Sequence, residues 1–586
     1  MTAPSGEAAS EVKQAAAVGV PPPRLPSADE SVLARGDDPP EPPARPATSP
    51  PRHIKISARV LVFWGRLLRT HPVAVALLAA GAVLRVLALM AYHPALLYTD
   101  TLKYLYGAWP GADPVGYTVI LKPILFVGDL GTVALVQHGL GLAMAVAIYA
   151  LLVRRGVPRW LAAVAMAPIL LDAYQLQIEQ TIMPDVWFEA IVVAGVVLLL
   201  WRPEPALWTI ATAGLIFGAS ATIRQIGLIL VMPALLYLAA ATTTRRLAMR
   251  GALTLLVTFA LPVLVYSGIS LQQNGHFNLS DEGSIAGRIT ATVDCATIVL
   301  PADERPLCPT PSQQANGIDW LEHSRQSPEK SFPVPNGVSR YALISGFDSA
   351  VEQQQPMRII GGILRDSLHL FDRTKSDVRG VTPIYRWQFQ KSYPRFLPEI
   401  NVARDHRIIL GVQVKTTQPF RFEPLNPAYG GRAQVDHSIA SFLRSYQLGG
   451  GYTPGPLLAL FAIAALVGSV MAFAGRRLVR SVGPGGGRGV KRAGPPGTPR
   501  DSEAGSAISG LGMACLLIFA EAIGVLLISD MFEFSWRYQL PALVTLPPAG
   551  VLGGWALWRV LAARRQVRVV QAPAQPLVPA TEPTPA

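Results

Sequence analysis

Charged residues are scarce in this chain of 586 residues, because only 15% are Asp, Glu, Lys or Arg while 50% are hydrophobic. The mean hydropathy is +0.33. This balance excludes an ordinary soluble enzyme and indicates a membrane protein. Cysteine is also rare: three residues are too few for a disulfide scaffold or a zinc site.

The positive charge lacks the pattern of a nucleic-acid-binding protein. The formal net charge is +13, but the Lys and Arg residues flank apolar runs and are not regularly interleaved with aromatic residues. Retention of basic segments in the cytoplasm explains this distribution better. We therefore expect membrane lipid, and no nucleic acid, among the partners.

Long apolar runs predict an all-α polytopic membrane protein with about ten transmembrane helices, since a span needs about 20 apolar residues. The ten segments are 73–92, 131–153, 158–173, 186–201, 206–222, 226–242, 251–270, 456–475, 507–529 and 540–562. With this count both termini are cytoplasmic, and the basic residues near 154, 245, 476–500 and 564 fall on the cytoplasmic side. Segment 116–127 carries Lys122 and Pro123 and is too short to span, so we expect it in the outer interface.

The spans divide the chain into five regions. We predict a disordered cytoplasmic tail at 1–51 and an N-terminal transmembrane module, with the first external loop, at 52–270. An extracytoplasmic mixed α/β or irregular domain follows at 271–455. The chain ends with a C-terminal transmembrane module at 456–563 and a second disordered cytoplasmic tail at 564–586. The C-terminal module contains a flexible, basic cytoplasmic loop at 476–506.

Two of the cysteines lie in the external domain. Cys295 and Cys308 share an oxidising compartment in this topology, so we expect a disulfide between them. Cys515 lies within an apolar span, where packing explains it. The high use of Ala, Arg, Gly and Pro fits a high-GC bacterium such as an actinobacterium.

Polar groups collect at the predicted outer ends of the helices. Asp100 follows the first span in the polar break Tyr98–Tyr104. The other candidates are Asp113, Glu179, Asp185, Arg224, Asp530, Glu533 and Arg537. Carboxylates and arginines at the edge of the hydrocarbon are costly unless they are paired or solvated, so their convergence predicts a wet pocket. Arg85 is expected to pair within the bundle, and His138 to be a buried, hydrogen-bonded histidine.

The order and sidedness of these short motifs resemble the glycosyltransferase C superfamily, in particular bacterial relatives of protein mannosyltransferases and aminoarabinose transferases of the family 39 type. The matching motifs are Tyr98-Thr99-Asp100, Asp113-Pro114-Val115-Gly116-Tyr117, the segment Glu179 to Asp185, and Arg537-Tyr538-Gln539-Leu540-Pro541. The resemblance covers roughly residues 70–270 and 456–562. An Asp-Xaa-Asp or a paired Asp-Glu is missing from the first loop, so a divalent metal cofactor stays open.

The resemblance implies an integral membrane transferase that moves a sugar from a polyprenyl phosphate to an acceptor on the outer face of the plasma membrane. The acceptor would be a cell-envelope polysaccharide, glycolipid or protein. Asp100 is then the candidate catalytic base. The candidate substrate-binding residues are Asp113, Glu179, Asp185, Arg224, Glu533 and Arg537, with the two arginines suited to the lipid phosphate.

Two other classes of protein stay open. A transporter or flippase for a lipid-linked or anionic substrate would also contain a charged cavity, but with polar or broken helices near the midplane and often with internal repeats. A non-catalytic scaffold would explain the external domain but not the polar cluster.

Overall fold

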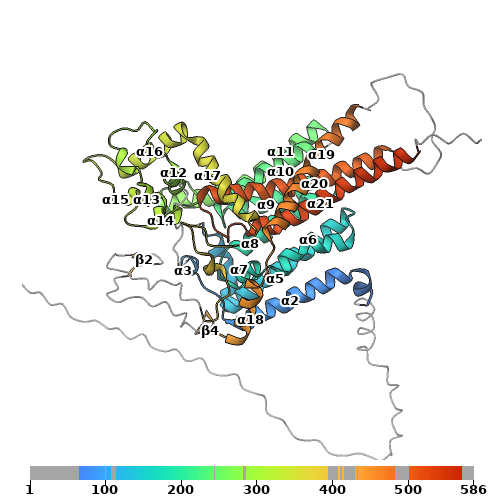
Figure 1. The fold of residues 1–586 in the computed structure, drawn as a ribbon, viewed down its shortest axis with the longest axis horizontal. Helices are drawn as coiled ribbons and strands as arrows, with labels where there is room; N and C mark the ends of the chain where they lie inside the picture. The colour runs from blue at the N-terminus through green and yellow to red at the C-terminus, as the bar shows by residue number, and fades with distance from the viewer. Residues whose placement is uncertain are drawn as a thin grey trace, which may run out of the picture. The chain divides into compact units, whose positions relative to one another are not determined.

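The computed structural model describes residues 65–98, 100–106, 114–242, 244–280, 285–393, 407–409, 412–414, 429–431, 433–481 and 501–570. Residues from Trp64 onward fall in one compact unit. Within the described residues the chain is mostly helical, and long helices run side by side with a group of short helices at one end (Figure 1).

The N-terminal part is a series of apolar helices with short connections. They are α2 (Pro72–Ala91), α3 (Thr101–Tyr106), α4 (Gly116–Val127), α5 (Leu130–Arg154), α6 (Arg159–Leu171), α7 (Ala173–Gln180), α8 (Asp185–Leu200), α9 (Leu207–Ala221), the 3-10 helix η1 (Gln225–Leu230), α10 (Val231–Ala241) and α11 (Arg245–Asn274). Three long helices close the fold: α19 (Gly455–Ser481), α20 (Asp501–Phe532) and α21 (Leu540–Val570). Every one of the ten apolar segments predicted from the sequence is therefore helical.

Fewer than ten helices are long and apolar enough to cross a membrane. Among the described residues there are five, namely Pro72–Ala91, Leu130–Arg154, Arg245–Gln273, Ser509–Phe532 and Leu540–Ala562. A sixth span results if α6 and α7, bent by 50°, count as one. The 15 residues of α9 extend only about 22 Å, against a hydrocarbon core of about 30 Å. The structure thus supports a multi-pass, all-α membrane protein, but helix length alone does not support ten spans.

Local sequence signals explain where several helices begin. Asp129 and Thr132 form a reciprocal capping box at the start of α5. Asp172 accepts a hydrogen bond from the Tyr174 backbone and so starts α7 directly after α6 ends. The same Asp172 carboxylate accepts a 2.6 Å hydrogen bond from the Thr453 backbone, which fixes the bend between α6 and α7 against the start of the C-terminal module.

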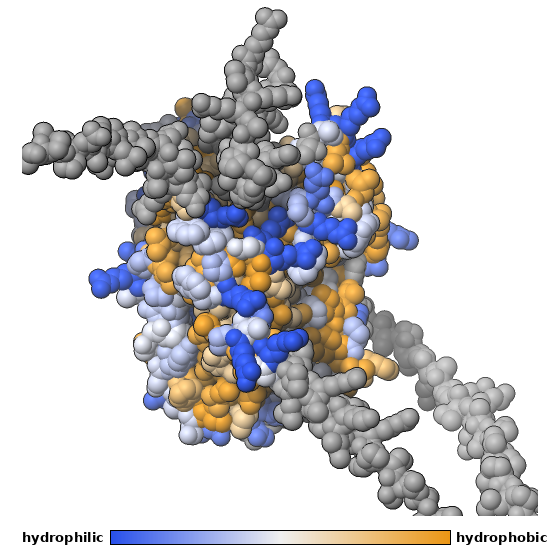
Figure 2. All heavy atoms as spheres, turned by 90° about the vertical axis from the view of Figure 1, so that its right-hand side faces the viewer, coloured by the Kyte–Doolittle hydropathy of each residue, from blue (hydrophilic) through white to orange (hydrophobic). Residues whose placement is uncertain are grey.

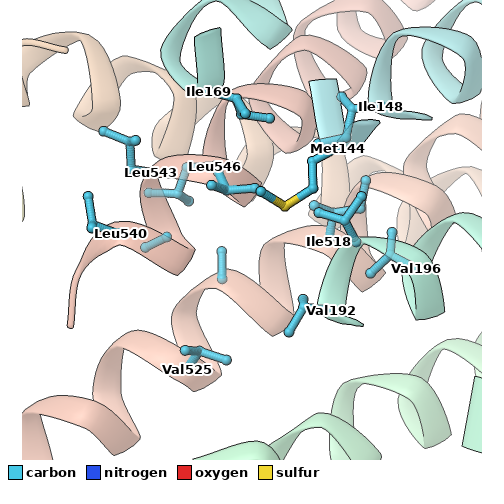
Figure 3. Packing of buried hydrophobic residues seen from close by; sticks show 14 of the residues in the cluster. Met144, Ile148, Ile169, Val192, Val196, Ile518, Val525, Leu540, Leu543 and Leu546 are labelled. Carbon is cyan, nitrogen blue, oxygen red and sulfur yellow. The ribbon is translucent and has the colours of Figure 1, made fainter. Parts of the chain in front are cut away.

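One large apolar core joins the N-terminal and C-terminal helices. In Figure 3, Met144 and Ile148 of α5 approach Val192 of α8, Ile518 of α20 and Leu546 of α21. These side chains are almost completely buried, and in a membrane such helices are held together by van der Waals packing. Packing of helices from both halves brings the beginning of α21 beside the polar break after α2.

The described residues of 271–455 form mainly short helices, with a few short strands and irregular segments. The helices are α12 (Ala286–Thr292), η2 (Arg305–Leu307), α13 (Pro311–Gln314), α14 (Ile318–His323), α15 (Pro328–Ser331), α16 (Arg340–Gln354), α17 (Pro356–Leu368), η3 (His369–Phe371), η4 (Ile384–Trp387) and α18 (His437–Leu448). The strands are β1 (Tyr92–His93) paired with β4 (Gln434–Val435), and β2 (Arg407–Ile409) paired with β3 (Val412–Val414).

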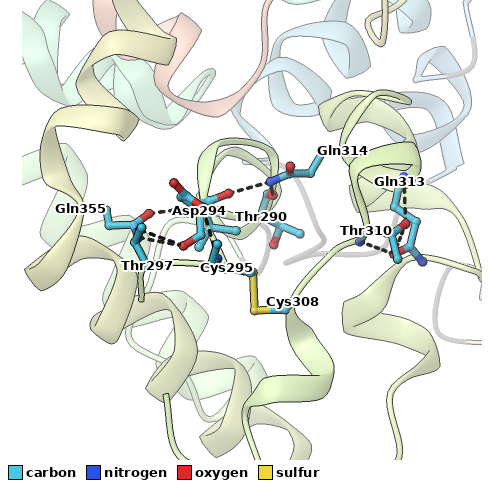
Figure 4. The surroundings of a disulfide bond; sticks show 11 residues. Thr290, Asp294, Cys295, Thr297, Cys308, Thr310, Gln313, Gln314 and Gln355 are labelled. Carbon is cyan, nitrogen blue, oxygen red and sulfur yellow. Dashed lines mark hydrogen bonds between the residues drawn. A yellow bond between two sulfur atoms is a disulfide. The ribbon is translucent and has the colours of Figure 1, made fainter. Parts of the chain in front are cut away.

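These residues do not form a single core of their own. Phe347 belongs to a small core built from α12, α16 and α17, whereas Trp387 and Phe389 are buried against the long helices. The Cys295–Cys308 disulfide borders the small core, beside the hydrogen bonds of Asp294 and Gln355 (Figure 4). The buried aromatic residues in the described part of this region are thus divided between the small core and the long helices.

Basic side chains mark the opposite end of the helices. Arg154 and Arg155 donate hydrogen bonds to the carbonyl groups of Trp201 and Leu200, which satisfies the end of α8. Figure 2 looks at the side of the molecule on the right of Figure 1, and hydrophilic side chains are scattered there among apolar ones. Arg154 and Arg155 thus have local structural partners as well as a place on the predicted cytoplasmic side.

Candidate functional site

Backbone hydrogen bonds hold the segment after α2 against the segment before α8. The Leu96 amide donates to the Gln180 carbonyl over 2.9 Å, and the Ile182 amide donates to the Leu96 carbonyl over 3.0 Å. The Thr101 hydroxyl adds a 3.0 Å bond to the Ile182 carbonyl. This clamp brings Asp100, just before Thr101, close to Asp185, just after Ile182.

Arg537 lies between these two carboxylates. Its Nη1 atom is 3.2 Å from Asp100 Oδ2, and its Nε atom is 3.7 Å from Asp185 Oδ1. Nη2 donates a 2.7 Å hydrogen bond to the Tyr538 hydroxyl. Burial disfavours the cation, but Tyr538 and the two carboxylates outweigh this and hold the pKa of Arg537 well above its ordinary value. Arg537 is therefore always charged.

Aromatic rings surround the same guanidinium. The central carbon of Arg537 is 4.5 Å from the ring centre of Tyr538, 5.1 Å from that of Trp387 and 5.7 Å from that of Tyr98. Arg224 is ion-paired with Asp185, and its central carbon lies 4.8 Å from the Tyr538 ring centre. Cation–π contacts of this kind fix the two arginines in place.

These groups line a cavity of about 750 Å³ at the end of the bundle where the short helices lie. The lysines and arginines of its lining are Lys103, Arg224, Lys330, Arg386 and Arg537, and this set without Lys330 is called here the basic cluster. Lys103 Nζ is 3.8 Å from Asp100 Oδ1, so both oxygens of the Asp100 carboxylate face cations. The volume is sufficient for a sugar phosphate, since ligand pockets are typically about 300–1,000 Å³.

The cavity also has an acidic cluster, which consists of Asp319, Glu322 and Glu533. Glu533 follows α20, whereas Asp319 and Glu322 lie on α14. Burial, with the negative charge of Asp319 and Glu322, raises the pKa of Glu533 to about 8. Oε1 of Glu533 is buried and has no hydrogen-bond partner among the described residues. At neutral pH this carboxyl is mostly protonated and is able to donate a hydrogen bond.

No family model, curated protein or solved structure matches the chain.

The structure brings together most of the candidate site residues. Asp100, Arg224, Glu533 and Arg537 line the cavity. Asp185 is completely buried directly behind them, with Oδ1 paired to Arg224 and Oδ2 without a partner among the described residues. Asp113 lies outside the described residues. Asp530 is not in the cavity, because it binds Ser367 and Arg288 and so anchors the short helices.

Glu179 does not reach the cavity, in contrast to its expected substrate-binding role. Its two carboxylate oxygens lie 2.7 Å from Arg85 Nη2 and 2.9 Å from His138 Nδ1, and all three side chains are buried. A Cβ atom at Gly141 would approach Glu179 Oε1 to 2.1 Å, so this glycine makes room for the carboxylate. Arg85 is thus paired within the bundle and His138 is a buried, hydrogen-bonded histidine, as expected. Both are partners of Glu179, because a buried carboxylate needs cationic or hydrogen-bonding partners.

The sequence analysis missed Lys103, Arg386 and the residues of α14. Lys103 stands in the same polar break as Asp100, and Arg386 stands between two aromatic residues in Tyr385-Arg386-Trp387; both patterns offered a signal. Among the described residues no group of three or more His, Cys, Asp or Glu side chains is arranged to hold a metal ion. The carboxylates of Asp100 and Asp185 are instead directed at Lys103, Arg224 and Arg537.

Proposed function

We propose that the protein is an integral membrane glycosyltransferase that moves a sugar from a polyprenyl-phosphate donor to a cell-envelope acceptor. The observation that carries this proposal is the meeting of Asp100 with Arg537 and Arg224 in one cavity at the ends of apolar helices. A carboxylate beside fixed cations suits a reaction in which a hydroxyl loses a proton while a phosphate leaves.

The proposed reaction is a direct displacement. The acceptor oxygen forms a bond to the anomeric carbon of the sugar, and the bond from that carbon to the phosphate oxygen breaks. The proton of the acceptor hydroxyl passes to Asp100, and the bonding electrons leave with the polyprenyl phosphate. Arg537 and Arg224 stabilise the charge that develops on the phosphate. Asp185 holds both arginines, and protonated Glu533 is suited to donate a hydrogen bond to a substrate oxygen.

The proposed topology has ten membrane-crossing helices, with residues 271–455 and the cavity outside the plasma membrane and residues 476–506 inside. The basic residues at the other end of the helices support this orientation. A cysteine placed at Ser324 should react with a membrane-impermeant maleimide on intact cells, and one at Ser481 should not. The reverse pattern would overturn the topology. Buried Cys515 and the Cys295–Cys308 disulfide should contribute little background.

A transporter or flippase is the second candidate, and the 50° break between α6 and α7 favours it. The cavity at the helix ends favours the transferase instead. Purified protein in nanodiscs should be incubated with radiolabelled polyprenyl phosphosugars and candidate acceptors. Only a transferase consumes the donor, so transfer to an acceptor supports the proposal. A donor that stays intact while it crosses the bilayer of proteoliposomes would favour the flippase.

A further inference from the structure

Residues of η4 complete the cavity from a part of the chain far from the other cavity residues. The Trp387 ring packs on the Tyr98 ring with centroids 4.7 Å apart. Arg386 Nη1 donates a 3.2 Å hydrogen bond to the Tyr98 hydroxyl, across 288 positions of sequence. These contacts place Arg386 directly beside the motif that contains Asp100.

Arg386 differs from the other two arginines of the basic cluster in its charge balance. Arg224 is paired with Asp185, and Arg537 lies between Asp100 and Asp185. Among the described residues no carboxylate lies within ion-pair distance of Arg386, and its buried Nε atom has no hydrogen-bond partner. Burying a guanidinium without a counterion costs free energy. A protein that keeps Arg386 half-buried in this way is therefore suited to bind an anion from outside.

The cavity lining as a whole is mixed in charge. It includes Lys103, Arg224, Lys330, Arg386 and Arg537, and also Asp100, Asp319, Glu322, Glu329 and Glu533. An incoming anion at Arg537 has to compete with Asp100 and Asp185, which lie within ion-pair distance of it. At Arg386 it competes with neither, and the planar guanidinium suits phosphate.

We propose that Arg386 is the anchor for the phosphate of a lipid-linked monophosphate, so that η4 supplies the primary anion-binding group of the donor site. The proposal rests on the proposed function, because it assigns the donor's phosphate to a particular residue. Arg537 and Arg224 then contact the same phosphate as charge develops on it. The segment 384–387 thereby determines whether a donor is recognised.

The test is a binding measurement on the full-length protein in nanodiscs, without any acceptor. The probes are a short-chain prenyl monophosphate, the uncharged prenol of the same length and inorganic phosphate. The variants are Arg386→Gln, Arg386→Lys and the matched control Arg373→Gln, which removes an exposed arginine outside the cavity lining. Unfolding midpoints are recorded for each variant.

We expect the wild type and the Arg373→Gln control to bind the prenyl monophosphate equally. Arg386→Gln should weaken this binding by at least about tenfold, since a charge-assisted hydrogen bond is lost. Arg386→Lys should lie between them, because it keeps the charge but loses the fork. It also keeps the proposal testable if Arg386→Gln folds poorly. The prenol should not bind, and inorganic phosphate should bind more weakly than the lipid phosphate.

Unchanged binding by folded Arg386→Gln would overturn the assignment while leaving the transferase proposal intact. Equal binding of inorganic phosphate and prenyl monophosphate would show an anion site that ignores the lipid and would also overturn it. Binding that depends on Arg386 in a protein that never consumes a donor would support the phosphate anchor and refute the transferase. A wild type that binds none of the probes would overturn both.

Discussion

Replacement of Asp100 by Asn tests whether this carboxylate accepts the proton in the proposed transfer. Asn has nearly the same size and keeps one oxygen to accept the hydrogen bond from Arg537 Nη1, which is 3.2 Å from Asp100 Oδ2. It does not accept a proton at neutral pH. If Asp100 is the base, turnover should fall by at least about a hundredfold, which corresponds to about 2.7 kcal/mol in the barrier.

The structure predicts a much smaller effect on folding. The Asp100 side chain is 22% exposed, and its ion pair with Lys103 is long at 3.8 Å. Pairs of this kind contribute about 1 kcal/mol or less, so loss of turnover should not reflect unfolding. Donor affinity should be largely retained, because Arg224, Arg386 and Arg537 remain.

The assay combines single-turnover transfer, donor binding and thermal unfolding in nanodiscs. Asp129→Asn is the matched control, since Asp129 caps α5 outside the cavity lining and Asn caps helices about as well as Asp. That control should behave as the wild type in all three measurements. Near-normal transfer by Asp100→Asn would remove Asp100 from the proton-transfer step.

Three further predictions concern the arginine, the disulfide and the buried acid. Arg537→Ala should weaken donor binding by at least about tenfold and lower the free energy of unfolding by about 1.5–3 kcal/mol, because Asp100 and Asp185 then keep only Lys103 and Arg224 as cationic partners; unchanged donor affinity would return Arg537 to a structural role. Removal of the Cys295–Cys308 bridge should destabilise the small core by about 3 kcal/mol for a loop of about 14 residues, and recovery of both cysteines as free thiols in non-reducing peptide mapping would refute the bridge. The pKa of Glu533 is about 8 in the folded protein and 4.5 ordinarily. Between these pH values the folded protein holds more protons than the unfolded chain, so the free energy of unfolding should fall as pH rises, by up to about 1.4 kcal/mol per pH unit. Glu533→Gln should flatten that slope in unfolding measurements from pH 4 to 9, and an unaltered slope would contradict the raised pKa.

The positions of the long helices could be predicted because they depend on local apolar runs. The number of spans was harder to predict, because α9 and the broken pair η1 and α10 are apolar but short. A sequence shows that such a segment is buried without showing whether it faces lipid or protein. The same limit applies to residues 271–455, whose aromatic residues identify a packed region but not its packing partner.

The candidate site was predictable to the extent that charge and position along the helices decide it. Asp100 and Arg537 meet, as expected for polar groups at the same ends of neighbouring helices. The pairing of Glu179 could not be predicted, because its partners Arg85 and His138 stand on two other helices. The aromatic neighbours of Arg386 marked it as unusual, but its place in the cavity depends on a contact with Tyr98 that spans 288 positions, and the local pattern does not encode such a contact.

The hydrogen bonds that join Leu96 to Gln180 and Ile182 have a kinetic consequence. They tie the segment that carries Asp100 to the backbone before α8, so this side of the cavity moves only when those hydrogen bonds break. The short helices have their own core and disulfide and are able to shift as a unit. Asp530 ties them to α20 through Ser367 and Arg288. One residue of α20 thus holds the short helices through both its carboxylate, bound to Ser367, and its backbone carbonyl, bound to Arg288.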